Sequence, residues 1–249
     1  MLPTWNHLWF LPYLFTYTLL LWATLRAWPQ ALDRLAARAG TLLAGAGLLL
    51  WPVLYLVLMR MALQGRFPVT HALVDDPFAH TQYLAAFVLG AVLARSGEVW
   101  PRMQRWRWVA LGLAAAAWAV LVFADPSPST LPWRRLAYGV QQWAAIVAAV
   151  GFAHRHLNQD GPWRRYLTEA VFPVYILHQT LIVLGATALA PAGLRPAVEG
   201  PLLVVGALVA GGLGFETVRR VRWLRPCFGL DRDPPASAGS RASRAISVP

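Results

Sequence analysis

The sequence predicts an all-α fold: a polytopic membrane helix bundle of seven transmembrane helices, with the N-terminus outside and the C-terminus in the cytoplasm. Three observations support this prediction. Of the 249 residues, 57% are hydrophobic and 13% are charged, and the mean hydropathy is +0.47. The apolar residues form blocks of roughly twenty, the length that crosses the hydrocarbon core of a bilayer. Short segments rich in arginine separate these blocks.

Seven apolar blocks qualify as membrane spans. In hydrocarbon the backbone must satisfy its own hydrogen bonds, and the blocks lack the alternation of barrel strands, so we expect helices. The third block begins with polar residues, since His80, Thr81 and Gln82 lie in its first turns. In order, the expected spans are 8–25, 41–59, 77–94, 108–124, 136–153, 170–189 and 201–218.

The arginines set the expected orientation. Seventeen of the 22 basic residues follow the first, third, fifth and seventh spans. The opposite segments hold the other five, which are Arg60, Arg66, Arg134, Arg135 and Arg195. Because short arginine-rich loops stay cytoplasmic, the chain should start outside and end inside. Residues 1–7 carry no charge and do not resemble a cleavable signal peptide.

Composition excludes several function classes. Every basic residue is arginine, so the chain has no lysine for a P-loop or a Schiff base. The net charge of +11 is confined to short segments between spans, where arginines face anionic lipid headgroups, so we expect membrane lipid and no nucleic acid as partner. The single Cys227 has no intrachain disulfide partner and no zinc-ligand spacing around it.

Tryptophans lie near the ends of several spans, beginning with Trp9 in the first. Such residues are typical of an interfacial belt. The alternative is that an aromatic side chain such as Trp9 contacts substrate.

The segment between the second and third spans is rich in titratable residues: His71, Asp75, Asp76 and His80. A metal site needs at least three convergent ligands, and no supporting motif is present, so we expect no metal. Two alternatives stay open. The segment is either a polar rim facing an extracytoplasmic substrate, with Asp76 as a contact, or a loop without a specific role.

The fifth span contains Tyr138, Gln141 and Gln142 in its first turns. Two consecutive glutamines cannot both face lipid cheaply. They are therefore expected either to form hydrogen bonds between helices or to bind a donor or acceptor substrate.

The sixth span carries Glu169 at its cytoplasmic entry, then Pro173, Tyr175 and His178. Pro173 removes the hydrogen bond to the Glu169 carbonyl and bends the helix. His178 should lie near the bilayer midplane and is the candidate catalytic residue. Either Tyr175 and His178 bond to neighbouring helices, or they line a substrate cavity together with Glu169.

The seventh span carries small residues at intervals of four, namely Gly206, Ala210 and Gly214. Such a stripe allows another helix to approach closely. Residues 231–249 are rich in Pro, Ser, Ala and Gly and should form a disordered cytoplasmic tail. Residues 1–230 then form one transmembrane domain.

Three short stretches resemble signatures of the acyltransferase 3 family of polytopic membrane O-acyltransferases, and they occur in the family's order. They are His7-Leu8-Trp9-Phe10-Leu11 with Tyr13 and Tyr17, Phe87-Val88-Leu89-Gly90 with Ala94-Arg95, and Tyr175-Ile176-Leu177-His178. The resemblance extends from His7 to about Leu230. The runs HALVDDPFAH and HRHLNQDGP are most similar to the branch that modifies periplasmic glucans.

This resemblance implies a multi-pass protein of the inner (plasma) membrane with no bound cofactor. It implies that acyl-CoA is the donor and that an acetyl or succinyl-like group passes to a sugar hydroxyl of a cell-envelope glycan or lipid-linked saccharide. A thioester acyl transfer needs a base near the hydroxyl and donors for the oxyanion. His178 alone supplies little of this, so we expect little activity from the isolated chain.

The family's bundle usually has ten helices, with its proposed catalytic His, preceded by an Arg, on the first. The resemblance to the middle of the family starts at residue 7, so we expect an N-terminally truncated form that lacks about three helices. Arg60 and His71 have the spacing of the family's pair, but they lie at the outer end of the second span and in the following loop. The family's roles are therefore not carried over to them.

Two other function classes remain. A transporter or flippase for a lipid-linked glycan would also use buried polar groups and a bent helix, and Pro173 fits either function. However, no pair of corresponding broken helices marks two repeated halves. The third reading is an inactive membrane fragment or a non-catalytic subunit.

Overall fold

The computed structural model describes residues 9–231 and divides the chain into two compact units, Met1–Asn158 and Gln159–Pro249. All regular structure in the described residues is helical, which confirms the predicted all-α class. The expected uncharged start, His7 of the first motif, and the expected disordered tail after Asp231 lie outside the described residues. The first unit contains α1 (Phe10–Ala27), α2 (Ala31–Leu42), α3 (Gly47–Leu63), α4 (Pro77–Arg95), α5 (Val99–Phe123) and α6 (Leu131–His156). The second contains α7 (Pro162–Leu189), η2 (Ala190–Ala192), α8 (Pro196–Arg220) and η3 (Pro226–Phe228).

Five of the described helices are long and apolar enough to cross a membrane: α4, α5, α6, α7 with η2, and α8. A sixth candidate arises if α2 and α3, bent by 109° at a short break, count as one span. The chain is therefore a multi-pass membrane protein. The expected first span corresponds to α1, which is not among these candidates because its proline, tyrosines and threonines lower its hydropathy. A count of seven spans stays a prediction.

The helix α2 is a difference from the sequence prediction, which assigns residues 31–40 to a cytoplasmic connection and begins the second span at residue 41, before the break between α2 and α3. Its apolar side buries Leu32 and Ala36 against Val92 of α4, while Arg34 is exposed. This is the pattern of an amphipathic helix, with apolar residues four apart. Its Asp33 also pairs with Arg95 at the end of α4, with 2.6 Å between Oδ1 and Nη1.

The helices α5, α6 and α7 each begin before the apolar block that predicts them. Hydropathy marks only the residues that prefer hydrocarbon, whereas a helix continues for as long as its backbone hydrogen bonds do. The additional first turns carry tryptophans and arginines, and Pro162 occupies the first turn of α7, where its missing N–H costs no helical bond.

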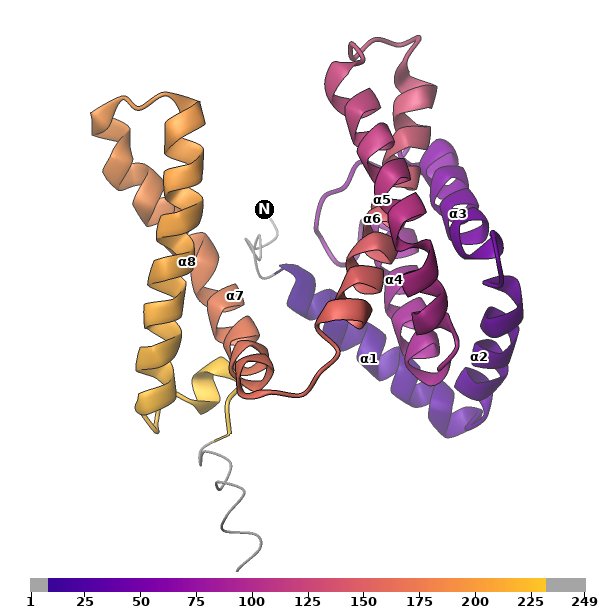
Figure 1. Ribbon diagram of the computed structural model, residues 1–249, viewed down its shortest axis with the longest axis horizontal. Coiled ribbons are helices and arrows are strands. Elements are labelled where there is room, and N and C mark those ends of the chain that lie inside the picture. The colour runs from indigo at the N-terminus through magenta and orange to yellow at the C-terminus, as the bar shows by residue number, and fades with distance from the viewer. Residues whose placement is uncertain (1–8, 232–249) are drawn as a thin grey trace, which may run out of the picture. The chain divides into compact units, whose positions relative to one another are not determined.

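The core of the first unit lies where α3 and α5 pack against α6 (Figure 1). Leu48, Met103 and Val147 are fully buried there. Close approach of the backbones requires glycine on α6, since a Cβ at Gly151 would overlap the carbonyl oxygen of Met103 on α5. The position of α6 against both neighbours is therefore fixed by shape as well as by apolarity.

In the second unit α7 and α8 form a helical hairpin (Figure 1). The predicted small-residue stripe is correct for Gly214, whose added Cβ would lie 2.6 Å from Leu177 of α7. It is wrong for Gly206, because an added Cβ there would have no atom within 4 Å. Gly211 contacts α7 instead, with its added Cβ 3.3 Å from Val174. Contact with α7 therefore follows a spacing of three on α8, because neighbours on a helix face recur at three and four residues.

Candidate functional site

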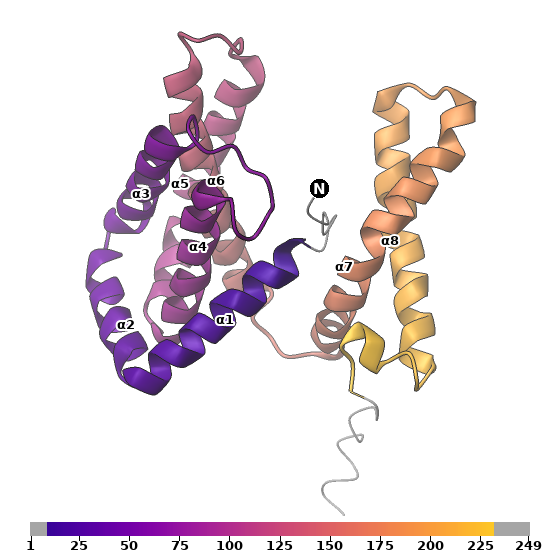
Figure 2. The ribbon, with the colours of Figure 1, turned by 180° about the vertical axis from the view of Figure 1, so that it is seen from behind.

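Asp76 organises the start of α4. Asp76 is fully buried, and its Oδ1 caps the helix by accepting a hydrogen bond from the Ala79 N–H at 3.2 Å. Its Oδ2 accepts from the Thr70 and His71 N–H groups at 3.1 and 2.9 Å and from the Tyr13 hydroxyl at 3.4 Å. A buried carboxylate is stable only with such donors. Asp76 therefore ties together α1, α4 and the 64–76 loop, whose backbones lie side by side in Figure 2.

Trp9, Tyr13, Tyr17, His71, His80 and Tyr83 form what we call the aromatic cluster. The Trp9 ring stacks on His71, with 4.2 Å between ring centroids, and lies 5.1 Å from Tyr83. His71 has a φ of 55°, an uncommon value for a residue with a side chain. Because its N–H bonds to Asp76, that carboxylate holds His71 in the strained conformation against Trp9.

His80 has both ring nitrogens engaged. Its Nε2 lies 2.7 Å from the Leu73 carbonyl oxygen, and its Nδ1 lies 2.7 Å from the Tyr17 hydroxyl. A carbonyl only accepts, so Nε2 carries the proton and, in the neutral ring, Nδ1 accepts from Tyr17. The imidazole of His80 is thus fixed in place, whereas the exposed ring of His71 has no hydrogen-bond partner among residues 9–231.

Arg60, at the end of α3, brings together two of the predicted site residues. Its Nη2 donates to Gln142 Oε1 at 3.0 Å, and its guanidinium lies over the rings of Tyr138 and Phe78, at 5.3 and 5.5 Å. Within the described part of the chain no carboxylate lies within 4.0 Å of Arg60, and its Nε has no acceptor. We call this group the Arg60 cluster. Gln141 is half-buried and forms no hydrogen bond with the described residues of this cluster.

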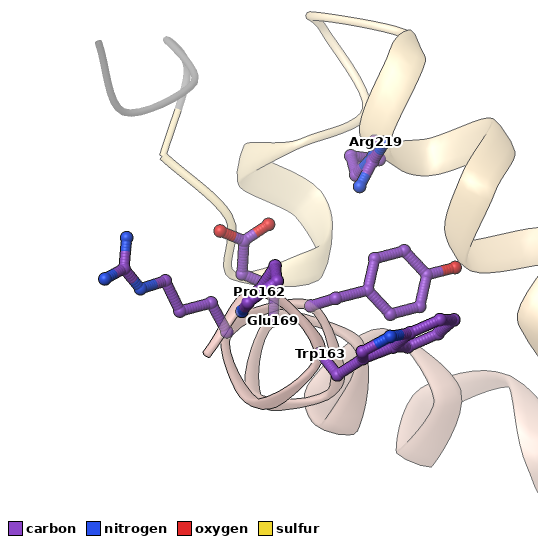
Figure 3. Close-up of a pocket in the computed structure, with 6 residues that line it drawn as sticks. Pro162, Trp163, Glu169 and Arg219 are labelled. Carbon is purple, nitrogen blue, oxygen red and sulfur yellow. The ribbon is translucent and has the colours of Figure 1, made fainter. Parts of the chain in front are cut away.

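Glu169 belongs to the second unit, where it lines a pocket of about 650 Å³ between the start of α7 and the end of α8 (Figure 3). Trp163, 76% exposed, also lines this pocket. The guanidinium of Arg219 lies 5.3 Å over the Tyr166 ring. The pocket lining is Pro162, Trp163, Arg165, Tyr166, Glu169 and Arg219.

Arg165 of this pocket forms an exposed pair with Asp160, at 3.2 Å. The hydrogen bond and charge of Arg165 hold the pKa of the Asp160 carboxyl below its ordinary value. Exposed pairs contribute little stability, so the guanidinium is available to a stronger anionic partner.

Tyr175 and His178 lie three residues apart on α7. The His178 Nδ1 lies 2.5 Å from the Tyr175 carbonyl oxygen, and the two rings are 5.4 Å apart. Since the carbonyl accepts, Nδ1 is the protonated nitrogen of a neutral His178. The structure thus links Trp9 to Asp76 through His71, and Tyr138 to Gln142 through Arg60. On α7, the pocket lined by Glu169 includes neither Tyr175 nor His178.

The sequence prediction named Tyr13, Tyr17, His80, His71 and Arg60 but chose none of them as a site residue. A signal for the first three exists, because Trp9, Tyr13 and Tyr17 recur every four residues, as do Asp76 and His80. This spacing aligns side chains on one helix face. No such periodicity marks Arg60, whose partners lie on other helices.

These features define an α-helical, multi-pass membrane protein with a polar and aromatic site at one end of its first unit. Residues 1–215 match the model of the acyltransferase 3 family, described as an acyltransferase domain, and the chain belongs to that family. No curated protein and no solved structure matches the chain. The resemblance inferred from the three motifs is thus confirmed, while the glucan-modifying branch and the truncation stay predictions. Within residues 9–231 no group of three His, Cys, Asp or Glu side chains could hold a metal ion.

Proposed function

We propose that the protein is an inner-membrane O-acyltransferase that transfers an acyl group from acyl-CoA to a sugar hydroxyl of a cell-envelope glycan or lipid-linked saccharide. The observation that carries the proposal is the stacked pair of Trp9 and exposed His71 in a member of an acyltransferase family. An aromatic face suits the C–H face of a sugar ring, and an accessible imidazole suits the proton of a hydroxyl.

The aromatic cluster is the acceptor site in this proposal. It lies at the start of α1 and α4, the end that the arginine asymmetry assigns to the outer side of the membrane. Trp9 and Tyr83 support the sugar ring. Asp76 acts as a positioning residue, because its oxygens are occupied by the loop that carries His71.

The proposed reaction uses His71 as general base. Its imidazole takes the hydroxyl proton while the sugar oxygen attacks the thioester carbonyl. The new C–O bond forms, the C–S bond breaks, and the imidazolium returns the proton to the CoA thiolate. Donors must stabilise the oxyanion that develops on the carbonyl oxygen. Arg60 has no carboxylate partner among residues 9–231 and lies against Phe78 of α4, so it suits that charge.

The donor site in this proposal is the pocket on α7 and α8, which holds the nucleotide of acyl-CoA, while the pantetheine arm extends into the membrane and carries the thioester to His71. The arginine count assigns this end of the hairpin to the cytoplasm, where acyl-CoA is available. The exposed Trp163 ring suits stacking on the adenine, and Arg165 and Arg219 suit its phosphates.

The test is acyl transfer in native membranes, with radiolabelled acetyl-CoA and the cell-envelope glycans as acceptors. Native membranes are chosen because the family resemblance implies little activity from the isolated chain. His71→Gln should reduce the transfer rate about 100-fold or more, since a general base contributes at least that factor. His80→Gln is the matched control for damage to the cluster, and His178→Gln tests the sequence-derived candidate.

Two results would contradict the proposal in different ways. If His178→Gln abolishes transfer while His71→Gln retains it, the base lies on α7 and the assignment of His71 is wrong. If membranes that contain the wild-type protein transfer no more label than membranes of a deletion strain, with acetyl-CoA and succinyl-CoA alike, the acyltransferase function is wrong for this chain.

A further inference from the structure

A cavity of about 250 Å³ lies between α3, α4 and α6, apart from the aromatic cluster. Its lining is mostly apolar. It consists of Pro52, Tyr55, Leu56, Gln82, Ala85, Ala86, Leu89, Gln142, Trp143 and Ile146. Tyr55 and Ile146 are 37% and 42% exposed, so the cavity opens sideways, at the surface of the helix bundle. If the three helices cross the membrane, that opening faces lipid.

The amide of Gln82 is the unexplained group in this cavity. The residue is only 5% exposed, and neither its Nε2 nor its Oε1 has a hydrogen-bond partner among the described residues. Three other polar groups of the lining are engaged: the Tyr55 hydroxyl donates to the Thr81 carbonyl, Gln142 Oε1 accepts from Arg60, and the Trp143 indole N–H donates to the Leu48 carbonyl. Leaving an amide unpaired in apolar surroundings costs about 1–3 kcal/mol. A ligand that pairs with it recovers this energy.

We propose that this cavity binds one acyl chain of a bilayer glycerolipid, with the Gln82 side chain rotating so that its Nε2 donates a hydrogen bond to the ester carbonyl. The volume is below the roughly 300–1,000 Å³ of sites for drug-sized ligands, so it suits part of a single chain, and the mostly apolar lining is unfavourable for a charged headgroup. The lining beyond Gln82 is hydrocarbon in character, as an acyl chain requires.

The depth of Gln82 along α4 supports an ester carbonyl as its partner. The helix begins at Pro77, so at ~1.5 Å per residue Gln82 lies roughly 8 Å below its start and Leu89 roughly 18 Å below. The polar interface of a bilayer is about 5–8 Å thick on each side of the hydrocarbon. With α4 starting at the membrane surface, Gln82 is level with the esters and Leu89 with the chains.

The first experiment compares two lipids on the wild-type protein in detergent. The probes are 1-palmitoyl-2-oleoyl phosphatidylglycerol and its dialkyl ether analogue, which lacks the carbonyls. The ester lipid should raise the thermal unfolding temperature more than the ether lipid does. Gln82→Met, which keeps the side-chain size and removes the amide, should make the two shifts equal. Equal shifts for the wild-type protein, or an ester preference that survives in Gln82→Met, would overturn the proposal.

The second experiment locates the chain. The protein is placed in nanodiscs of the ester lipid with a small fraction carrying a diazirine on one acyl chain, and cross-linked peptides are identified by mass spectrometry. Cross-links should concentrate on α4 and α6 around Leu89 and Ile146. Ala86→Trp should reduce them at least fivefold by filling the cavity. The matched control is Ala115→Trp on the exposed side of α5.

Cross-links spread evenly over the apolar surfaces of α5 and α8, or unchanged by Ala86→Trp, would show an ordinary lipid contact and contradict the site. Neither experiment measures acyl transfer. The lipid site can therefore fail while the proposed function stands, and the reverse also holds.

Discussion

The indole Nε1 of Trp143 on α6 donates to the main-chain carbonyl of Leu48 on α3, with 2.7 Å between the two atoms. This carbonyl lacks its ordinary helical partner, because the residue four positions later is Pro52, which has no N–H. Both side chains are buried, so water cannot supply the missing donor. A side chain of α6 thus supplies the hydrogen bond that the backbone of α3 lacks.

Trp143→Phe should destabilise the protein by about 2 kcal/mol, because it leaves the Leu48 carbonyl unpaired and a small void behind. Pro52→Ala supplies a backbone N–H to the same carbonyl. In the double variant this N–H should recover part of the loss. Unfolding in detergent with increasing denaturant measures all four proteins of the cycle. Strictly additive effects would show that the indole hydrogen bond and the proline are not coupled.

Gly151→Ala should separate α5 from α6. The new Cβ would overlap the Met103 carbonyl oxygen, and overpacking of this kind costs about 1–3 kcal/mol. Gly112→Ala on α5 is the matched control, because no atom lies within 4 Å of its added Cβ. The control should be neutral or stabilising, as alanine favours helix. Equal stability of the two variants would rule out a close contact at Gly151.

Asp76→Asn should loosen the loop that carries His71. The amide can still accept, but it loses the charge that strengthens the bonds from the Thr70 and His71 N–H groups. Hydrogen exchange at these two amides should become at least tenfold faster. Asp75→Asn, at an exposed neighbour, should leave their exchange unchanged. Unchanged exchange in Asp76→Asn would mean that the carboxylate does not hold the loop.

The proposed orientation predicts which residues a membrane-impermeant maleimide reaches. Cys227, the single cysteine and exposed, should react only after cells are permeabilised. With Cys227→Ser as background, Ser129→Cys after α5 should react in intact cells, whereas Gly97→Cys before α5 should not. Both positions are exposed, so access depends on the side of the membrane. Labelling of both in intact cells would contradict the orientation.

Removal of a guanidinium from the pocket on α7 and α8 should weaken donor binding. Arg165→Gln and Arg219→Gln should each raise the KM for acyl-CoA about tenfold with kcat nearly unchanged, since a charge-assisted hydrogen bond contributes about 1.5–3 kcal/mol. Arg195→Gln, at the other end of α8, is the control. A fall in kcat at constant KM would place these arginines in the chemistry instead of the donor site.

Local properties of consecutive residues allowed much of this protein to be predicted. Blocks of apolar residues predicted the helical membrane class, because transfer into hydrocarbon depends on about twenty neighbouring side chains. Three short motifs predicted the family that residues 1–215 confirm. Trp9 and Asp76 were both chosen as site residues, although nothing local indicated that one loop brings them together.

Helix ends and contacts between helices were decided by the tertiary structure. The helix α2 was missed because its twelve residues are partly polar and partly apolar and form no apolar block. Their apolar side is buried only because it packs on α4. The partnership of Arg60 with Gln142 joins residues 82 positions apart. Hydropathy follows from each side chain alone, so the sequence determined which segments enter the membrane. Hydrogen bonds and close packing depend on which surfaces meet, so only the folded bundle decided how those segments build a site.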